Sequence, residues 1–435
     1  MIDHQAELAN LWGGSPPRVV GGRCLNVRHR GRDCHICVDA CPVSAISIPN
    51  QAGGGAEPIV LDQKTCVHCG LCLNVCPTGV FAQTEPPESK LHQALARSSS
   101  QVIELACPRK DPPDLSRVPE ADVVQTPRCL AALSVPTLLD LTAGGKTLWL
   151  NDSICHTCPI GGARQTIDET VTVADRWLRV MGHASAIRST LDAVDELAEA
   201  STHRSLIRGD RSVLSRRDFF KSLTGRTAQA TGGLMADRDG PRSGESESAY
   251  PGDSRADRED TEERTGHRLA HHIPAQRQHL ASALRRLTHD PMAQVSTAGL
   301  PVADVTVSDS CTACGLCAQF CPTEAITFLS DGEYYVLHFS AALCLGEDCS
   351  LCIIGCPTDA VRFDQELIVD ELLSTQPRPL KAGGLAPCPQ CGAPTHAPVE
   401  EDESAEVLLC HICQAQTNRP DLLSSLREVN DWEAT

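Results

Sequence analysis

The sequence predicts an α+β protein of several small domains: two copies of a cysteine-rich module, a central α/β domain with a parallel sheet, a C-terminal cysteine ribbon and a disordered linker. Three observations predict this fold class. The 435 residues include 24 cysteines, which fall into six groups of four. Strand-like and helix-like segments alternate over residues 100–185, as they do in domains built on parallel sheets. Residues 225–275 are rich in Gly, Ser, Asp, Glu and Arg and hold too few apolar side chains to form a core.

The overall composition narrows the function classes. The formal net charge is −18, and aromatic residues make up 3 % of the chain. An acidic balance argues against general nucleic-acid binding, which relies on Lys and Arg neutralising phosphates. No apolar run approaches the roughly 18 residues of a membrane span, and the N-terminus lacks the basic and apolar regions of a signal peptide. We therefore expect a soluble cytoplasmic protein with no membrane insertion.

The cysteines stand mostly in Cys-x-x-Cys runs, which suit metal binding better than the disulfide frameworks of short secreted chains. The six groups use every cysteine in the chain. In chain order the groups are Cys24, Cys34, Cys37 and Cys41; Cys66, Cys69, Cys72 and Cys76; Cys107, Cys129, Cys155 and Cys158; Cys311, Cys314, Cys317 and Cys321; Cys344, Cys349, Cys352 and Cys356; and Cys388, Cys391, Cys410 and Cys413.

The second and fourth groups match the pattern Cys-x2-Cys-x2-Cys-x3-Cys-Pro without deviation, at 66–77 and 311–322. This run resembles that of bacterial ferredoxins, and the resemblance implies [4Fe–4S] clusters. The first and fifth groups keep the Cys-x2-Cys-x3-Cys-Pro ending but have a longer gap after Cys24 and after Cys344. We interpret them as variants of the same site, with a [3Fe–4S] cluster or no cluster if Cys24 points elsewhere. Structural zinc or disulfides are the alternative.

The segments 20–90 and 300–366 therefore each resemble a two-cluster ferredoxin, so the chain contains this module twice. The connections between the cysteine groups predict one strand pair in each module, 45–48 with 59–61 and 325–329 with 334–339. In bacterial ferredoxins the fourth cysteine of each run binds the other cluster. That rule predicts four ligand sets: Cys24, Cys34, Cys37 and Cys76; Cys66, Cys69, Cys72 and Cys41; Cys311, Cys314, Cys317 and Cys356; and Cys344, Cys349, Cys352 and Cys321.

Between the two modules the sequence predicts a domain at 100–185 in which cysteines follow strands. The expected strands are 101–106, 121–126 and 147–150, and the expected helices cover 130–141 and the residues after Cys158. In parallel sheets ligands gather beyond the carboxyl ends of the strands. Cys107, Cys129 and the Cys155–Cys158 pair can therefore converge although they are far apart in the sequence.

The segment 100–183 resembles the delta subunit of methyl-viologen-reducing hydrogenases and its relatives, which pass electrons from a hydrogenase or formate dehydrogenase toward a heterodisulfide reductase. The resemblance rests on Arg128-Cys129-Leu130 at the start of a helix and on the strand 148–150 that leads into Cys155-His156-Thr157-Cys158. It implies a [2Fe–2S] or other iron–sulfur cluster on Cys107, Cys129, Cys155 and Cys158. A redox dithiol at Cys155 and Cys158, zinc, or simple burial are the alternatives.

Residues 384–418 contain two further Cys-x-x-Cys pairs, Cys388 with Cys391 and Cys410 with Cys413. Their spacing is typical of a zinc ribbon, in which two knuckles close one tetrahedral site. A rubredoxin-like iron is the alternative metal. Four thiolates leave no open position for a catalytic water, so we expect no hydrolytic activity at this site.

The segment 186–224 is expected to be helical. Apolar residues recur at helical spacing over 187–200. Asp192, Glu196 and Glu199 would then lie on the solvated face of this helix, as surface groups rather than acid–base catalysts.

The motif Ser215–Lys221 is similar to a twin-arginine export signal. It follows more than two hundred residues and no apolar region succeeds it, so we do not expect export. The start of a basic amphipathic helix is the alternative interpretation. A related start occurs in NapF-type ferredoxins, which assist periplasmic nitrate reductase and which the segment 212–363 resembles.

The sequence as a whole predicts an iron–sulfur electron-transfer protein with four [4Fe–4S] clusters, a further iron–sulfur cluster and a zinc ribbon. We expect a non-catalytic subunit that relays single electrons within a larger oxidoreductase complex, with a hydrogenase, dehydrogenase or reductase subunit as its partner. An accessory ferredoxin for reductase maturation and a thiol/disulfide reductase using Cys155 and Cys158 are the alternatives. The histidines between the cysteines are expected to be spacers rather than ligands: His35, His68, His156 and His411.

Overall fold

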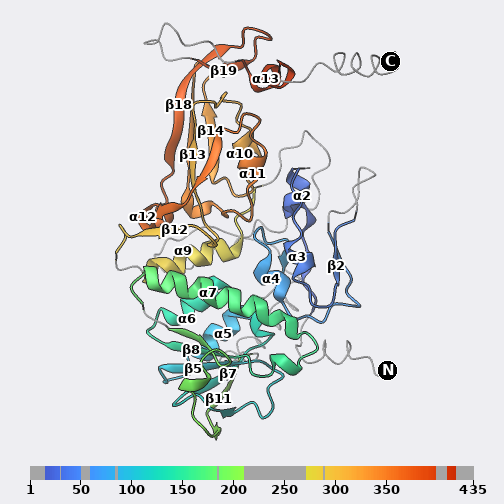
Figure 1. Cartoon of the computed structure of the whole chain (residues 1–435), viewed down its shortest axis with the longest axis vertical. Helices are drawn as coiled ribbons and strands as arrows, with labels where there is room; N and C mark the ends of the chain where they lie inside the picture. Colours follow the sequence, from blue (N-terminus) through green and yellow to red (C-terminus); the bar gives the residue numbers. More distant parts are fainter. Residues whose placement is uncertain are drawn as a thin grey trace, which may run out of the picture. The chain divides into compact units, whose positions relative to one another are not determined.

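The computed structural model describes residues 15–29, 31–49, 59–83, 87–183, 186–209, 271–287, 290–397 and 409–417. These residues belong to one compact unit, and Figure 1 labels its elements. The Ser215–Lys221 motif and nearly all of the linker expected at 225–275 lie outside the described residues. No helix in the described ranges is long and apolar enough to cross a membrane.

The first cysteine-rich module consists of two small antiparallel strand pairs with short helices between them. Its elements are β1 (Arg18–Val19), α2 (Leu25–Arg28), α3 (Ile36–Asp39), β2 (Ile46–Ser47), β3 (Val60–Leu61), α4 (Leu71–Val75) and β4 (Phe81–Ala82). Strand β1 pairs with β4, and β2 pairs with β3, which confirms the strand pair expected in the connection. Three cysteines share the core of this module with Ile46, Ile59, Val80 and Phe81.

The second module repeats this plan and enlarges it. Its elements are β12 (Gln294–Ser296), β13 (Asp304–Val307), α10 (Leu316–Phe320), β14 (Ile326–Ser330), β15 (Tyr334–Phe339), α11 (Leu351–Ile354), β16 (Val361–Asp364), β17 (Glu366–Ile368) and α12 (Val369–Leu373). The antiparallel pairs are β13 with β16, β12 with β17, and β14 with β15, and the last is the pair expected from the sequence.

A long strand joins the second module to the C-terminal cysteine pairs. Strand β18 (Arg378–Pro387) pairs with β15 and then with β19 (Pro394–His396). After a further segment the chain ends its described part in α13 (His411–Thr417). The ribbon cysteines therefore lie at the end of the sheet of the second module.

The central domain is a parallel sheet in the order β11-β7-β5-β8-β9. Its strands are β5 (Val102–Ala106), β7 (Asp122–Gln125), β8 (Thr147–Asn151), β9 (Ile187–Ser189) and β11 (Leu206–Arg208), and the helices around it are α5 (Pro87–Leu95), α6 (Val135–Thr142) and α7 (Arg164–Val180). Both faces of β5 are buried, as is typical of a strand inside a parallel sheet. The three strands expected from the sequence are confirmed, and so is their parallel direction.

The helix expected over 187–200 is wrong. This region contains β9, a 3₁₀ turn at Val194–Glu196 and, further on, β10 (Thr202–His203) and β11. Pairing with the sheet overrides the helical spacing, because β9 adds directly to β8, and β11 to β7. Glu196 forms an ion pair with Arg188 of β9 rather than lying on a helix face. The central domain thus continues to residue 209, well beyond the boundary expected at 185.

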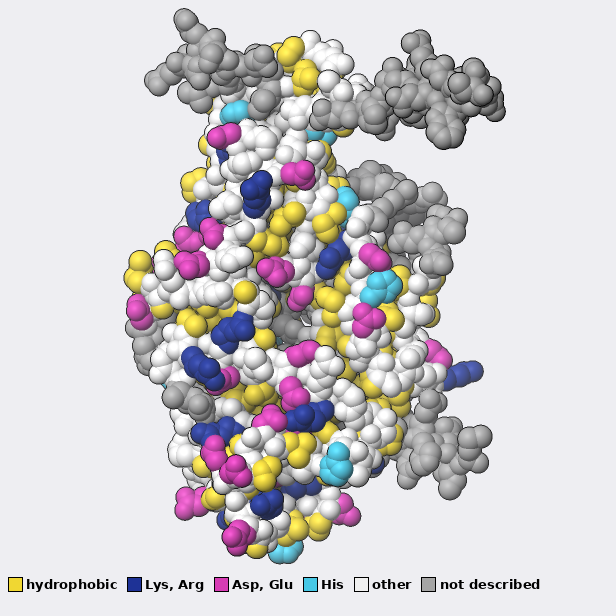
Figure 2. Space-filling model, in the orientation of Figure 1, with side chains coloured by type: hydrophobic (Ala, Val, Ile, Leu, Met, Phe, Trp, Pro, Cys, Tyr) yellow, Lys and Arg dark blue, Asp and Glu magenta, His cyan; other side chains and the backbone are white. Residues whose placement is uncertain are grey.

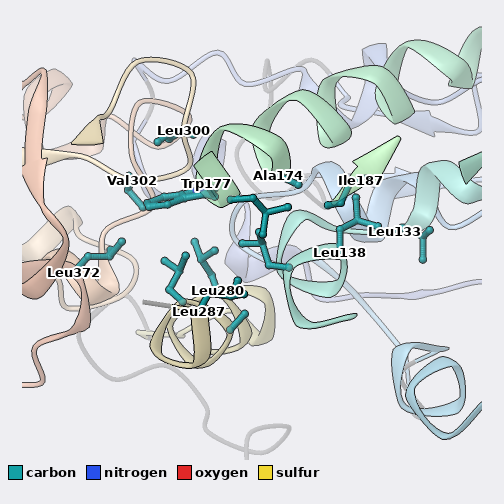
Figure 3. Close-up of a cluster of buried hydrophobic side chains, with 14 of the residues drawn as sticks. Leu133, Leu138, Ala174, Trp177, Ile187, Leu280, Leu287, Leu300, Val302 and Leu372 are labelled. Atoms are coloured by element: carbon teal, nitrogen blue, oxygen red, sulfur yellow. The ribbon is translucent and has the colours of Figure 1, made fainter. Parts of the chain in front are cut away.

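Helix α9 (Ala275–Leu287) was not expected from the sequence. It contacts the first module, the central domain and the second module. Its Gln276 side chain donates to the carbonyl of Leu73 in the first module. Its Leu280 and Leu287 face Trp177 of α7 in the buried cluster of Figure 3. Its Arg277 is 5 % exposed and donates to the carbonyls of Ala341, Ala342 and Pro301 in the second module. Burial lowers the pKa of Arg277 to about 10, so this arginine stays charged at neutral pH.

On the surface in Figure 2, acidic and basic side chains of the described residues are interspersed. The net charge of −18 is therefore not gathered into one patch on that face.

Candidate metal centres

The four Cys-Pro loops of the two modules share one backbone geometry. In three of them the backbone N–H four residues after the cysteine donates to its sulfur: Ala45 to Cys41 (3.2 Å), Val80 to Cys76 (3.4 Å) and Ala360 to Cys356 (3.2 Å). The residue before that N–H has a positive φ in every loop, with values of 51° at Ser44, 64° at Gly79, 59° at Glu324 and 51° at Asp359. The chain thus curls back over each sulfur, and amide donors of this kind tune the potential of a bound cluster.

At two positions of the uninterrupted cysteine runs, only glycine fits the backbone conformation and the space. Gly70 and Gly315 have φ values of 89° and 70° and start α4 and α10. A Cβ on Gly70 would lie 2.8 Å from the Cβ of Ala132 in the central domain. The close approach of the first module to the central domain therefore depends on glycine at this position.

The first module brings its thiols together in the exchanged sets that the sequence predicts. Burial, followed by the thiols of Cys76, Cys34 and Cys24, raises the pKa of Cys37 to about 12. We call these four cysteines set A. Burial raises the pKa of Cys69 to about 11, with the thiols of Cys41 and Cys66 adding to the effect. The pKa of Cys72 is raised by burial and by the same neighbours. Set B is Cys41, Cys66, Cys69 and Cys72.

The second module repeats this exchange. Burial, then Cys321 and Cys344, raises the pKa of Cys349 to about 12, and burial raises that of Cys352, whose neighbours are the same thiols. Set C is Cys321, Cys344, Cys349 and Cys352. Burial, then Cys311, Cys314 and Cys356, raises the pKa of Cys317 to about 12. Set D is Cys311, Cys314, Cys317 and Cys356.

Two of these sets line cavities. One small cavity is lined by all four cysteines of set A, and a second by all four of set C. Isoleucine, leucine and valine side chains make up much of the remaining walls. Both sites therefore offer four thiols around a space largely walled by apolar groups.

The central domain gathers its four cysteines as the parallel sheet predicts. Cys107 directly follows β5, while Cys129 and Cys155 stand four residues after β7 and β8. Burial, then Asp152, Cys107 and Cys158, raises the pKa of Cys155 to about 12. Burial and the Cys107 thiol raise the pKa of Cys129. The central set is Cys107, Cys129, Cys155 and Cys158.

Buried ion pairs hold the loops of the central set in place. Glu104 on β5 is fully buried, accepts from Asn151 Nδ2 (2.6 Å) and pairs with Lys110 (3.3 Å), which lies three residues after Cys107. Asp152, also fully buried, accepts from Arg164 Nε (3.0 Å) and from the hydroxyls and amide of 189–191. These two carboxylates fix the loops that carry Cys107 and Cys155.

The spacing of the thiols separates two kinds of site. Among the described residues, only the ribbon set, Cys388, Cys391, Cys410 and Cys413, has its ligand atoms all within 4.8 Å of one another. A tetrahedral ion with metal–sulfur bonds of about 2.3 Å needs sulfurs about 3.8 Å apart, and Cys391 Sγ lies 3.5 Å from Cys410 Sγ. The ribbon set fits one ion. The other sets are less compact, as expected where four thiols surround a cluster of several irons rather than a single ion.

The charge balance also favours metal at these sites. All 24 cysteines are described, and none forms a disulfide. Four buried thiols in one set cannot all ionise against burial and mutual repulsion. Metal ions supply the compensating positive charge, since thiolates are the form that binds metal. The buried sets therefore fit a positively charged metal group rather than free thiolates.

The four histidines between the cysteines take up other positions. His35 bonds Asp33 through Nε2 (2.7 Å), and His156 is exposed. His68 adopts a φ of 58°, and His411 begins α13. None of the four belongs to the ribbon set, the one compact ligand group among the described residues.

Three arginines near the thiols were not expected from the sequence to act at these sites, although Arg128 belongs to the Arg128-Cys129-Leu130 motif. Arg109 Nη1 donates to Cys158 Sγ at 3.1 Å. Arg28 and Arg128 are 4 % and 7 % exposed and face thiols of sets C and B. The only signal in the sequence was their position, since each lies within four residues of a cysteine. Their burial could not be expected, because arginine is rarely buried.

Comparison with protein families agrees with the two modules. The model of the 4Fe-4S dicluster domain matches residues 32–80, and that of the 4Fe-4S binding domain matches residues 305–327. These matches cover cysteines of both modules, so the chain contains [4Fe–4S] ferredoxin domains. No solved structure matches the chain.

Three relatives are similar over one short stretch each. Over 55 residues (12 % of this chain, 30 % of the relative) the chain is 34 % identical to the aliphatic sulfonate oxidoreductase, polyferredoxin-like subunit, of Pyrococcus furiosus. Over 62 residues (14 % and 34 %) it is 37 % identical to the ferredoxin-type protein NapF of Haemophilus influenzae. The chain thus spans about a third of these two relatives.

The third relative is matched over most of its length. It is a ferredoxin of Methanocaldococcus jannaschii, 35 % identical over 57 residues, which are 13 % of this chain and 82 % of the relative. Since the chain contains nearly the whole of such a protein together with both family matches, it belongs to the 4Fe-4S ferredoxins and is an iron–sulfur electron-transfer protein.

Proposed function

We propose that the protein is a multi-centre electron relay that works as a subunit of a larger oxidoreductase complex in the cytoplasm. Sets A, B, C and D would each bind a [4Fe–4S] cluster, the central set a [2Fe–2S] or other iron–sulfur cluster, and the ribbon set a structural zinc or a rubredoxin-like iron. Each iron–sulfur cluster, when bound, can accept and release one electron. The observation that carries this proposal is that thiols of different sets adjoin one another.

Pairs of neighbouring thiols show which sets lie next to each other. Cys129 of the central set has Cys69 of set B as a neighbour. Cys72 of set B has Cys76 of set A, and Cys352 of set C has Cys317 of set D. The residues around them exclude water: Leu71 and Leu351, which stand beside cysteines of sets B and C, are 2 % and 0 % exposed.

The central domain supports a specific partner class. The resemblance to the hydrogenase delta subunit is carried by Arg128-Cys129-Leu130 and by the Cys155–Cys158 loop after strand β8. Cys155 and Cys158 are half-buried, and His156 and Thr157 between them are exposed. We therefore place the contact with a hydrogenase, dehydrogenase or reductase subunit at this loop. The polyferredoxin-like relative is itself a subunit of an oxidoreductase by its name.

The test is anaerobic purification with iron, sulfide and zinc analysis and EPR. Four [4Fe–4S] clusters predict about 16 irons and a [2Fe–2S] cluster about two more. Cys155→Ser should remove only the irons of the central set, and Cys413→Ser only the ribbon metal. A preparation that contains zinc and little iron would contradict the relay.

One variant also separates the relay from a thiol/disulfide reductase that uses Cys155 and Cys158. In a relay, Cys155→Ser abolishes electron transfer to or from the partner and alters the iron content. In a dithiol enzyme it abolishes disulfide reduction and leaves the iron content unchanged.

A further inference from the structure

Two of the junctions between the modules and the central domain each contain a buried arginine, Arg128 and Arg28. The first junction joins the central domain to set B. The second joins α2 of the first module to set C of the second module. Each arginine comes from one part and faces the thiols of the next.

At the first junction, Arg128 reaches from the central domain into the cysteine loop of set B. Its Nη1 donates to the carbonyl of His68 (3.0 Å), which stands between Cys66 and Cys69. Asn74 of α4 fixes the same contact by donating to the carbonyl of Ala131 (3.1 Å). The thiols of Cys72, Cys69 and Cys66 are the acidic groups that most favour its charged form.

At the second junction, α2 docks onto the loops of set C. Leu25 of α2 packs in one buried cluster with Leu345, Cys349 and Leu351. Arg32 Nη2 donates to the carbonyl of Asp348 (2.7 Å), and the His29 ring meets Phe320 edge-on with centroids 4.9 Å apart. Asp348 and Phe320 directly precede Cys349 and Cys321 in the sequence.

Arg28 is the charged group that this docking buries. It belongs to α2 and is 4 % exposed. Burial lowers its pKa, while the thiols of Cys321 and Cys349 favour its charged form. A guanidinium remains protonated at neutral pH despite such burial, so Arg28 places a positive charge from the first module beside set C.

We propose that Arg128 and Arg28 raise the reduction potentials of the clusters at sets B and C. The two clusters next to the inter-domain junctions are then reduced more readily than they would be without these arginines. This inference rests on the relay function above. A reduced cluster carries one more negative charge than the oxidised cluster, and a nearby positive charge favours the reduced form. Arg128 and Arg28 thus act through their charge on the clusters and touch no substrate.

The experiment is an EPR-monitored redox titration of the purified holoprotein and its variants. Arg28→Met should lower the midpoint of one wave, and Arg128→Met that of a different wave. We expect each oxidised-to-reduced equilibrium to change at least about tenfold, which is about 59 mV for one electron. Arg28→Lys and Arg128→Lys keep the charge and should leave the midpoints close to those of the natural protein. Arg179→Met, which removes a charge from a side chain that is 71 % exposed, is the surface control.

The outcomes separate the two proposals. An anaerobically purified protein that contains no iron and sulfide would refute the relay itself. Clusters that are present but show unchanged midpoints in the methionine variants, or one common shift in every wave and in Arg179→Met, would refute the role of the arginines. If a methionine variant loses iron, the glutamine variant of the same arginine, Arg28→Gln or Arg128→Gln, is compared with its lysine variant. The proposal then requires a shifted wave in the Gln variant and an unshifted wave in the Lys variant.

Discussion

The two ferredoxin modules and the central domain assemble four thiols in opposite ways. In the modules, three cysteines of a set come from one short run, and the fourth comes from the run of the partner set. In the central domain, the cysteines follow three separate strands, and the sheet brings them together. In the first module, three of the seven buried core residues are cysteines, Cys24, Cys37 and Cys76. The core of the central domain consists of aliphatic side chains, with Leu105, Leu138 and Leu148 fully buried.

This difference shows which sites depend on metal for their shape. A module with a small core has little besides its clusters to offset the entropy of folding. A parallel sheet buried on both faces does not need its ligands to be stable. Metal binding and folding should therefore be strongly coupled in the modules and weakly coupled in the central domain.

The largest expected effect tests this coupling directly. Removing iron with an anaerobic chelator should abolish the hydrogen-exchange protection of peptides from 15–83, because the core of this module contains Cys24, Cys37 and Cys76. Peptides from β5 and β8 should keep their protection, as measured by mass spectrometry. Equal loss in both regions would contradict the comparison.

The next effect concerns the exchanged ligand. Cys76→Ser should remove about four irons, those of set A, although Cys76 belongs in sequence to the run of Cys66, Cys69 and Cys72. Iron analysis and the loss of one EPR signal are the measurements. Cys41→Ser is the matched variant and should remove the signal of set B instead. If the two variants removed each other's signals, the ligand exchange would be wrong.

A smaller effect is expected where the central domain holds its loop. Asp152→Ala should lower the free energy of unfolding by about 3–5 kcal/mol, because the hydroxyls of Ser189 and Thr190 and the N–H of Leu191 would lose their buried acceptor, at about 1–3 kcal/mol for each unsatisfied group. Denaturant unfolding followed by tryptophan fluorescence measures it. Asp192→Ala removes an exposed partner of Arg164, which also pairs with Asp152, and should cost less than about 1 kcal/mol. Similar losses in both variants would show that burial is not what matters.

The smallest effect comes from single hydroxyl groups beside the sulfurs. Thr78 Oγ1 lies 3.7 Å from Cys76 Sγ, and Thr323 and Thr358 repeat this contact at 3.8 Å, whereas Cys41 has Val43 in the same place. Thr78→Val should lower the potential of set A, and Val43→Thr should raise that of set B. The equilibria should change by no more than about tenfold, because one net hydrogen bond contributes about 0.5–1.5 kcal/mol. Shifts of the same sign in both variants would argue against this account.

Local sequence patterns made the two modules and part of the central domain predictable. The strand pair at 325–339 follows from the connection between two cysteine groups, and the exchanged sets follow from the resemblance of the cysteine runs to those of bacterial ferredoxins. The strands 101–106, 121–126 and 147–150 follow from runs of apolar residues, and the site at their carboxyl ends follows from the topology of parallel sheets. All of these features depend on residues close together in the sequence or on one general rule.

The features that were missed depend on distant pairing. Residues 187–189 have helical spacing but form a strand, because the edge of β8 was available to pair with them. Helix α9 could have been predicted, because Leu280, Leu284 and Leu287 recur at helical spacing after a long polar segment; only its burial against Trp177 depends on a distant part of the chain. Arg28 and Arg128 matter through contacts with another part of the chain, which no local pattern encodes.

Helix α9 has a consequence for how the polypeptide assembles. It lies after the segment 210–270 in sequence, yet its side chains bond to the first module and pack on the central domain. The two halves of the chain are thus joined by a buried interface as well as by the peptide backbone. Fragments 1–209 and 271–435, expressed as separate polypeptides, should therefore reassociate into one particle, and the continuous chain serves mainly to fix their ratio at one to one.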